Sequence, residues 1–219
     1  MSSLDSTYSV GVDEAGKGPV LGSMYVVAAY VPDSPAGLRD SKRLSPERRR
    51  ELASTLRSDE DNEFEVVEVS ADEVDAYVDG DGTTMNDLVV DAHASALQGL
   101  DVPDVAVVDA SDTSESRFQE MVSRRVENDV VAEHGADDLH AAVAAASVVA
   151  KVERDRHVDE IGERYDVDVG SGYPGDSRTL GFLKDYLVEN GSLPSEVRCS
   201  WDTCRRLEAE VSQAGFDDF

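Results

Sequence analysis

Short apolar segments alternate with amphipathic segments of helical length along this chain, and that alternation limits the folds open to it. The β-rich runs occupy residues 7–12, 21–31, 63–70, 104–110 and 128–134. The helical patterns between and after them cover residues 44–58, 85–100, 114–126 and a long stretch from about residue 141. Strands that alternate with helices predict an α/β fold, in which helices flank a sheet. Because only a glycine–proline turn separates the first two runs, we expect an antiparallel hairpin there and a mixed β-sheet.

Two shorter helical segments, at about residues 179–190 and 202–213, follow the long helix. No internal repeat and no low-complexity linker divides the 219 residues, which are enough for a large buried core. We therefore expect one main domain over residues 1–180 and a small helical C-terminal extension over residues 181–219.

The chain is strongly acidic, with 47 acidic against 20 basic residues and a formal net charge of −27. Self-repulsion on this scale destabilises a compact state in dilute buffer. At about 1 M salt the screening length falls to roughly 3 Å, so the repulsion is largely removed. We therefore predict adaptation to molar salt, as in salt-loving archaea. The chain lacks the basic face typical of nucleic-acid binders, but counterion release contributes little affinity at that salt concentration, so nucleic acid is not excluded.

Targeting and membrane signals are absent from the sequence. The first residues have neither a basic nor an apolar region, and the longest apolar runs fall short of the roughly 20 residues that span a bilayer. The two cysteines, Cys199 and Cys204, have no nearby histidine, which predicts free thiols rather than a zinc site. We expect a cytoplasmic monomer that does not bind membranes.

Two aspartates stand at the ends of apolar strands. Asp13 ends the first run and Asp109 ends the segment "VAVVDA", so the two side chains meet at one sheet edge if these strands are neighbours. Adjacent strand residues face opposite sides, so Glu14 joins Asp13 only if the strand breaks at Glu14, which the glycines after it favour. Clustered carboxylates suit Mg²⁺ or Mn²⁺, and two such ions suit phosphodiester hydrolysis. The alternative is a set of solvated surface acids.

The turn Gly16-Lys17-Gly18 permits close backbone approach, so its N–H groups are candidates to bind a phosphate or a hydroxyl. The alternative is an ordinary hairpin turn, since the P-loop pattern is missing. Tyr173 lies among glycines, where an aromatic ring can stack on a sugar or base, or simply pack in a turn. Four histidines lack metal-like spacing and receive no catalytic role: His93, His134, His140 and His157.

Five segments together match one family in their order and spacing. They are "GVDEAGKGPVLG", "LRDSKRLSPERRREL", "VVDASD", "AAASVVAKVERDR" and "GSGYPGDSRT". The chain resembles ribonuclease HII (type 2 ribonuclease H) of the archaeal type over about residues 8–180, with a weaker match in "RCSWDT" at 198–203. The resemblance implies a ribonuclease H-like fold and an endonuclease that cleaves RNA in RNA–DNA hybrids. It also implies incision 5′ of ribonucleotides embedded in duplex DNA, leaving 3′-hydroxyl and 5′-phosphate ends.

The resemblance implies four catalytic carboxylates that hold two Mn²⁺ or Mg²⁺ ions: Asp13, Glu14, Asp109 and Asp137. A metal-activated water would then attack the phosphate in line, without a protein nucleophile. Asp138 is the alternative to Asp137, because the lysine and tyrosine that the family usually places around this aspartate are missing here.

The resemblance also implies substrate contacts. Gly16-Lys17-Gly18 matches the family's glycine–arginine–glycine motif, which senses the ribose 2′-hydroxyl together with a tyrosine that matches Tyr173. Lysine keeps the backbone contacts of that motif but loses the forked contact of arginine to phosphate. Lys42 resembles a residue that contacts substrate phosphate, or else is simply a lysine near a helix start.

Three interpretations stay open outside this picture. The C-terminal "SQAGFDDF" either binds a sliding clamp or is a frayed terminus. The same acids would also suit a metal-dependent phosphohydrolase of small metabolites. A hybrid-binding module without catalysis is the third reading.

Overall fold

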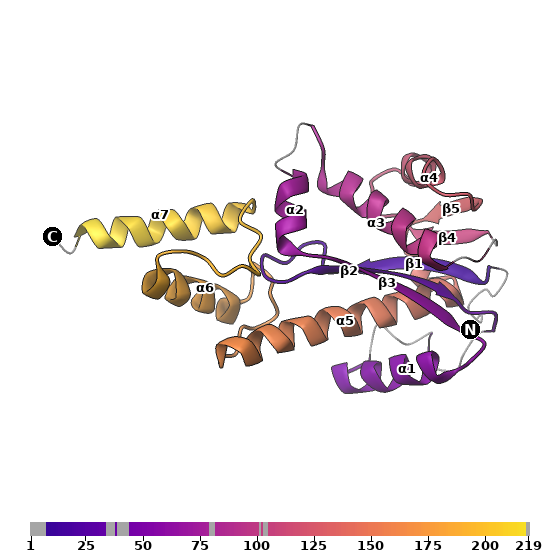
Figure 1. Ribbon diagram of the computed structural model, residues 1–219, viewed down its shortest axis with the longest axis horizontal. Coiled ribbons are helices and arrows are strands. Elements are labelled where there is room, and N and C mark those ends of the chain that lie inside the picture. Colours follow the sequence, from indigo (N-terminus) through magenta and orange to yellow (C-terminus); the bar gives the residue numbers. More distant parts are fainter. Residues whose placement is uncertain are drawn as a thin grey trace. The chain divides into compact units, whose positions relative to one another are not determined.

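The computed structural model describes residues 8–33, 38, 44–78, 82–100, 102 and 105–217, with side chains up to residue 213. Its five-stranded sheet has the order β3-β2-β1-β4-β5 (Figure 1). The strands are β1 (Val10–Ala15), β2 (Met24–Tyr30), β3 (Glu63–Val69), β4 (Ala106–Asp109) and β5 (Val130–Glu133). β1 pairs antiparallel with β2 and parallel with β4, and β4 pairs parallel with β5, which confirms the expected hairpin and the mixed sheet.

The helices follow the predicted alternation. They are α1 (Pro46–Ser58), α2 (Ala71–Val78), α3 (Met85–Leu100), α4 (Glu115–Ser123), α5 (Ala141–Tyr165), α6 (Ser177–Asn190) and α7 (Asp202–Asp217), with a 3-10 turn η2 (Ala136–Asp138) before α5. Ser45 caps α1 by accepting a hydrogen bond from the N–H of Arg48, and Pro46 occupies the first helical position. None of the helices in the described ranges is long and apolar enough to cross a membrane.

The chain forms two compact units that interleave along the sequence. The first comprises Met1–Ala15, Tyr25–Glu68 and Asn86–Glu153, and the second comprises Gly16–Met24, Val69–Met85 and Arg154–Phe219. The sheet belongs almost entirely to the first unit, whereas α2, α6 and α7 belong to the second. The predicted division into a main domain over residues 1–180 and a helical extension over residues 181–219 stays a prediction.

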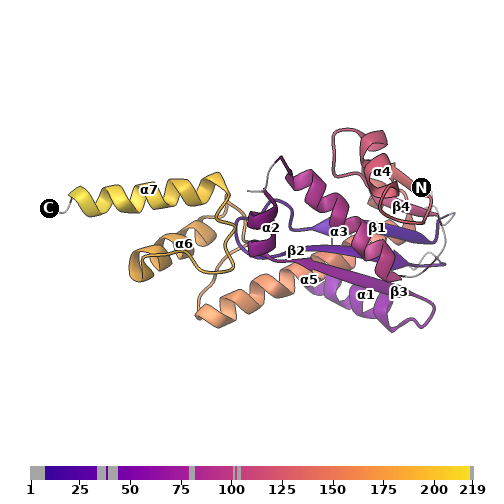
Figure 2. The same ribbon diagram turned by 45° about the horizontal axis from the view of Figure 1, so that its top comes forward.

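In the first unit, α1 and α5 cover one face of the sheet and α3 and α4 cover the other (Figures 1 and 2). The first half of α5 consists of small residues, and Ala141–Ala150 is buried. This small-residue face lies against β1 at Gly11, where an added Cβ would stand 2.2 Å from the backbone nitrogen of Val143. Close packing at Gly11 therefore fixes α5 against the strand that carries Asp13.

The core of the second unit joins the end of α5 to α6 and α7. Ile161, Leu183, Val197 and Leu207 are among its buried members. An isolated β-bridge between Leu21 and Val197 ties the segment after β1 into this core.

Two features differ from expectation. β1 does not break at Glu14: it continues to Ala15, and Glu14 pairs with Val26 of β2, because the hairpin ladder holds the strand until Gly16. Helix α2 was not predicted, although Ser70 and Glu73 form a capping box at its start, with the N–H of Ser70 donating to Glu73 Oε2 at 2.8 Å.

Candidate carboxylate site

Asp13 and Asp109 lie on neighbouring parallel strands in the first unit, where Asp109 is the last residue of β4 and Asp13 lies two residues before the end of β1. Gly11 pairs with Val107, so the residues two positions further along each strand share one edge and one face of the sheet. That face is covered by α5, since Val107 packs with Val143. The structure thus brings together the two aspartates that the sequence predicted to be neighbours, although β1 extends beyond Asp13.

The charges of these aspartates repel one another. Burial, followed by the nearby charges of Glu14 and Asp109, raises the pKa of Asp13 well above its ordinary value. Burial also raises the pKa of Asp109, and Asp137 and Glu14 raise it further, while the Ala136 N–H donates to Asp109 Oδ1 at 3.0 Å and opposes the shift. The unit therefore holds several carboxylates whose charges interact with one another around the buried Asp13.

Helix α5 contributes two polar side chains to this group. Lys151 Nζ donates to Ser147 Oγ at 2.6 Å and lies 4.0 Å from Asp137 Oδ2. Ser147 in turn donates to Asp137 Oδ2 at 3.5 Å and lowers the pKa of Asp13 by hydrogen bonding. Asp138, the alternative to Asp137, is exposed. Neither Ser147 nor Lys151 received a role from the sequence, although their i, i+4 spacing places them on one helix face.

Glu14 points to the opposite face of β1, as an unbroken strand requires. His93 Nε2 of α3 donates to Glu14 Oε2 at 2.9 Å, and Ser111 Oγ donates to Oε1 at 2.5 Å. His93 is fully buried and meets Phe118 edge-on with the ring centroids 5.2 Å apart. The expectation that the strand breaks at Glu14 is therefore wrong. After burial, the charge of Glu14 nevertheless raises the pKa of both Asp13 and Asp109, so its carboxylate lies close enough to interact with both aspartates. Sequence reasoning identified neither His93 nor Ser111 as a partner of Glu14.

The Gly16-Lys17-Gly18 turn and Tyr173 both belong to the second unit. Gly16 has a φ of 90°, a left-handed conformation that favours glycine. A Cβ on Gly18 would lie 3.7 Å from Tyr173 Cε1, so the ring stands beside the turn. Tyr173 is 41% exposed, and the Arg154 guanidinium lies 5.7 Å from the centre of its ring. The two predicted substrate contacts are therefore neighbours, whereas Lys42 lies outside the described residues.

Comparison with known proteins decides the family. The model of the family described as Ribonuclease HII matches residues 10–204. The chain belongs to the ribonuclease HII family. A ribonuclease HII from Halobacterium salinarum is 48% identical over 217 residues, which is 95% of this chain and 98% of that relative. As a member of this family the chain is a hydrolytic nuclease, and the predicted family is confirmed.

Solved structures confirm the ribonuclease H-like fold. The ribonuclease H2 of Pyrococcus horikoshii superimposes with a TM-score of 0.84 at 34% identity, covering 93% of this chain and 98% of that one. The ribonuclease HII of Archaeoglobus fulgidus, solved as a complex with PCNA, gives a TM-score of 0.82 at 37% identity, covering 90% and 95%.

Metal dependence, a property of the ribonuclease HII family, can be tested against the residues present. Within the described ranges, no three His, Cys, Asp or Glu side chains already converge on one point where an ion could bind. The donor set nevertheless fits a hard divalent cation, because it consists of carboxylate oxygens. Burial and then the neighbouring negative charges raise the pKa values of Asp13 and Asp109, and a bound cation would stabilise both groups in their charged form.

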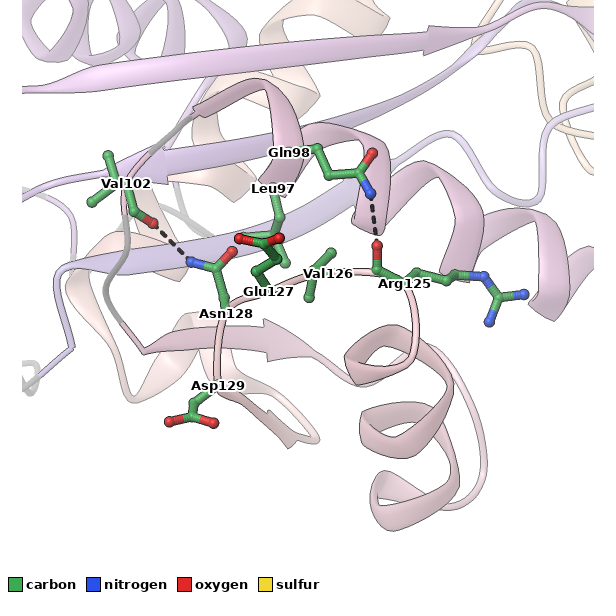
Figure 3. A pocket seen from close by; sticks show the side chains of 8 residues that line it. All are labelled: Leu97, Gln98, Val102, Arg125, Val126, Glu127, Asn128 and Asp129. Atoms are coloured by element: carbon green, nitrogen blue, oxygen red, sulfur yellow. Dashed lines mark hydrogen bonds between the residues drawn. The ribbon is translucent and has the colours of Figure 1, made fainter.

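A separate cavity of about 760 Å³ lies at the amino ends of β4 and β5, the opposite end of β4 from Asp109. Figure 3 shows its wall, where Gln98 Nε2 donates to the Arg125 carbonyl at 2.6 Å and Asn128 Nδ2 donates to the Val102 carbonyl at 2.7 Å. These two bonds tie the loop between α4 and β5 to the end of α3 and to Val102. In this ribonuclease HII family member the cavity is therefore distinct from the carboxylate site.

Proposed function

We propose that this chain hydrolyses RNA in RNA–DNA hybrids and incises duplex DNA 5′ of an embedded ribonucleotide, leaving 3′-hydroxyl and 5′-phosphate ends. One observation carries the proposal: Asp13 and Asp109 lie at equivalent positions of neighbouring parallel strands and repel one another in a chain that matches ribonuclease HII over residues 10–204. Relatives named Ribonuclease HII share nearly its whole length.

Asp13, Glu14, Asp109 and Asp137 would hold two divalent ions, Mn²⁺ or Mg²⁺. When bound, such ions supply Lewis acidity and a water of lowered pKa for in-line attack on phosphate. The contact of Asp137 with Ser147 and the exposure of Asp138 support Asp137 as the fourth carboxylate.

The chain's own residues orient these carboxylates. The Ala136 N–H binds one oxygen of Asp109, and Ser147 and Lys151 hold Asp137 from α5. His93 and Ser111 bind both oxygens of Glu14. The N–H of Glu14 donates to Asp13 Oδ1 at 2.8 Å. Each carboxylate is thus restrained by a main-chain or side-chain donor, which reduces the reorganisation that the reaction needs.

Substrate contacts complete the proposal. The Gly16-Lys17-Gly18 turn and Tyr173 would read the ribose 2′-hydroxyl, which their proximity supports. Lys42 would contact a substrate phosphate.

An assay with three outcomes tests this function. The enzyme is incubated in molar KCl with Mn²⁺ or Mg²⁺ and a duplex that carries one ribonucleotide, and small phosphate esters are assayed in parallel. Nicking 5′ of the ribonucleotide is the expected result. Binding without nicking would favour a non-catalytic hybrid-binding module, and hydrolysis of the small esters alone would favour a metabolite phosphohydrolase.

We also propose that the C-terminal tail binds a sliding clamp. Two facts support it: the Archaeoglobus fulgidus relative was solved with PCNA, and this chain ends in Phe-Asp-Asp-Phe. Co-elution of the chain with a clamp in size-exclusion chromatography should be lost when residues 213–219 are deleted. Unchanged co-elution would refute a role for the tail.

A further inference from the structure

We propose that Arg198 is a positioning residue for ribonucleotide recognition, because it binds the carbonyl side of the Gly16-Lys17-Gly18 turn and thereby directs the turn's N–H groups outward. The inference rests on the proposed function of that turn. It gives the segment 198–201 a defined part in substrate discrimination.

Arg198 is completely buried, and all its guanidinium hydrogen bonds within the described chain end on main-chain oxygens. Nη2 donates to the Gly16 carbonyl at 2.7 Å, and Nη1 donates to the Lys17 carbonyl at 3.0 Å. Nε and Nη2 both donate to the Gly22 carbonyl, at 3.1 and 2.9 Å. One side chain therefore connects the start of the loop to its end.

A second residue of the same segment extends these contacts. Trp201 lies 5.3 Å from the Arg198 guanidinium, measured to its ring centre, and its Nε1 donates to the Gly18 carbonyl at 3.4 Å. The N–H of Arg198 itself donates to the Val20 carbonyl at 2.9 Å. The carbonyls of all three residues of the turn are thus bound by Arg198 or Trp201.

The direction of the N–H groups follows from peptide geometry. A trans peptide group points its C=O and its N–H to opposite sides. Binding the carbonyls of Gly16 and Lys17 therefore turns the N–H groups of Lys17 and Gly18 away from Arg198. Gly18 is exposed, and Tyr173 stands beside it. Two adjacent N–H groups fixed beside an exposed aromatic ring can recognise a ribose hydroxyl.

Four hydrogen bonds to main-chain oxygens hold the Arg198 guanidinium inside the protein. Burial lowers the pKa of Arg198 to about 10, the direction expected of a positive charge removed from water. Arginine suits the task because its planar fork supplies several donors in fixed directions. A lysine has a single nitrogen, so it cannot reach Gly16, Lys17 and Gly22 with the same geometry.

The test compares the affinities for two duplexes, one with a single ribonucleotide and one of the same sequence made only of deoxynucleotides. Ca²⁺ replaces Mn²⁺ so that the duplex stays intact, which gel analysis verifies, and binding is followed in molar KCl by fluorescence polarisation. The ratio of the two dissociation constants measures discrimination. A partly unfolded sample weakens both apparent affinities equally and leaves this ratio unchanged.

Arg198→Lys should reduce the ratio about tenfold toward one, with the affinity for the all-deoxy duplex unchanged, in keeping with the loss of charged hydrogen bonds. Trp201→Phe keeps a ring over Arg198 but loses the bond to Gly18, so it should give a smaller reduction and serves if Arg198→Lys does not fold. Arg205→Gln, an exposed arginine of α7 paired with Asp202, is the matched control and should keep the full ratio.

A wild-type ratio in both Arg198→Lys and Trp201→Phe would overturn the inference. If the wild type itself binds both duplexes equally, the proposed ribonucleotide recognition fails instead, and that result is visible before any variant is made.

Discussion

Replacing Gly11 by alanine should lower both the stability of the protein and its rate of nicking, because this glycine sets the distance between β1 and α5. A Cβ at this position would lie 2.2 Å from the Val143 nitrogen and 2.4 Å from the Ala142 carbonyl carbon. Ordinary contact begins at 3.4 Å, so one element must move by more than 1 Å. Both obstructing atoms belong to the backbone of a helix, and no side-chain rotation relieves them.

The magnitude follows from two opposing effects. Inserting a methyl group into a well-packed core costs typically about 1–3 kcal/mol. Alanine restricts the unfolded chain more than glycine does, which returns about 0.4–1 kcal/mol. The backbone clash places Gly11→Ala at the upper end, so we expect a net loss of about 2 kcal/mol, or roughly 4–8 °C in melting temperature for a chain of this size.

Gly181→Ala is the matched control. Gly181 lies within α6, and an added Cβ there would meet nothing within 4 Å. Alanine in a helix should stabilise by about 0.5–1 kcal/mol relative to glycine. The same glycine-to-alanine change should thus lower the free energy of unfolding at residue 11 and raise it at residue 181.

Thermal unfolding followed by circular dichroism in molar KCl measures both variants, and nicking assays below the transition measure activity. Gly11→Ala should lose activity as well, because Ser147 and Lys151 move with α5. If Gly11→Ala melts at or above the wild type, the packing argument at β1 is refuted.

Three further outcomes are expected. Hydrogen bonds from Arg117, then the N–H of Ser114, lower the pKa of Asp112 to about 2, so its contribution to stability is present above pH 4 and is lost as the pH falls toward 2. Asp112→Asn should therefore lower the free energy of unfolding, measured with urea at pH 7, by about 2 kcal/mol. Between pH 4 and pH 2 the stability of this variant should fall less steeply than that of the wild type. With a net charge of −27, the wild type should melt at a higher temperature in about 3 M than in about 0.1 M KCl. Asp13→Asn should abolish nicking yet raise the unfolding free energy in EDTA at neutral pH, since burial and the charges of Glu14 and Asp109 raise the pKa of Asp13; an unchanged or lower value would argue against that repulsion.

Sequence reasoning located the carboxylate site because the local pattern of apolar residues and the order of the strands point to the same place. The apolar runs that precede Asp13 and Asp109 revealed the carboxylate site, because equivalent positions of two parallel neighbours lie side by side. The strand break at Glu14 was wrong, since the glycines that follow are permissive but the pairing of Ala15 with Tyr25 carries β1 one residue further. A local pattern does not show how far a partner strand extends.

The contacts that hold the site come from distant parts of the chain and have no local signature. His93 lies 79 residues from Glu14, and Arg198 lies 181 residues from Lys17. A buried histidine on an apolar helix face and an arginine near two cysteines are both unremarkable in sequence. Only the fold shows that each binds a predicted functional segment.

The central claim is that the carboxylates on β1 and β4 support cleavage next to a ribonucleotide, and one measurement tests it most directly. Single-turnover nicking of a duplex with one ribonucleotide is measured in molar KCl with Mn²⁺ for the wild type, Asp109→Asn and Glu133→Gln. Glu133 is the matched acid, paired in register with Asp109 at the same sheet edge. We expect nicking 5′ of the ribonucleotide by the wild type and by Glu133→Gln, and none by a folded Asp109→Asn. Near-wild-type nicking by Asp109→Asn would contradict the account.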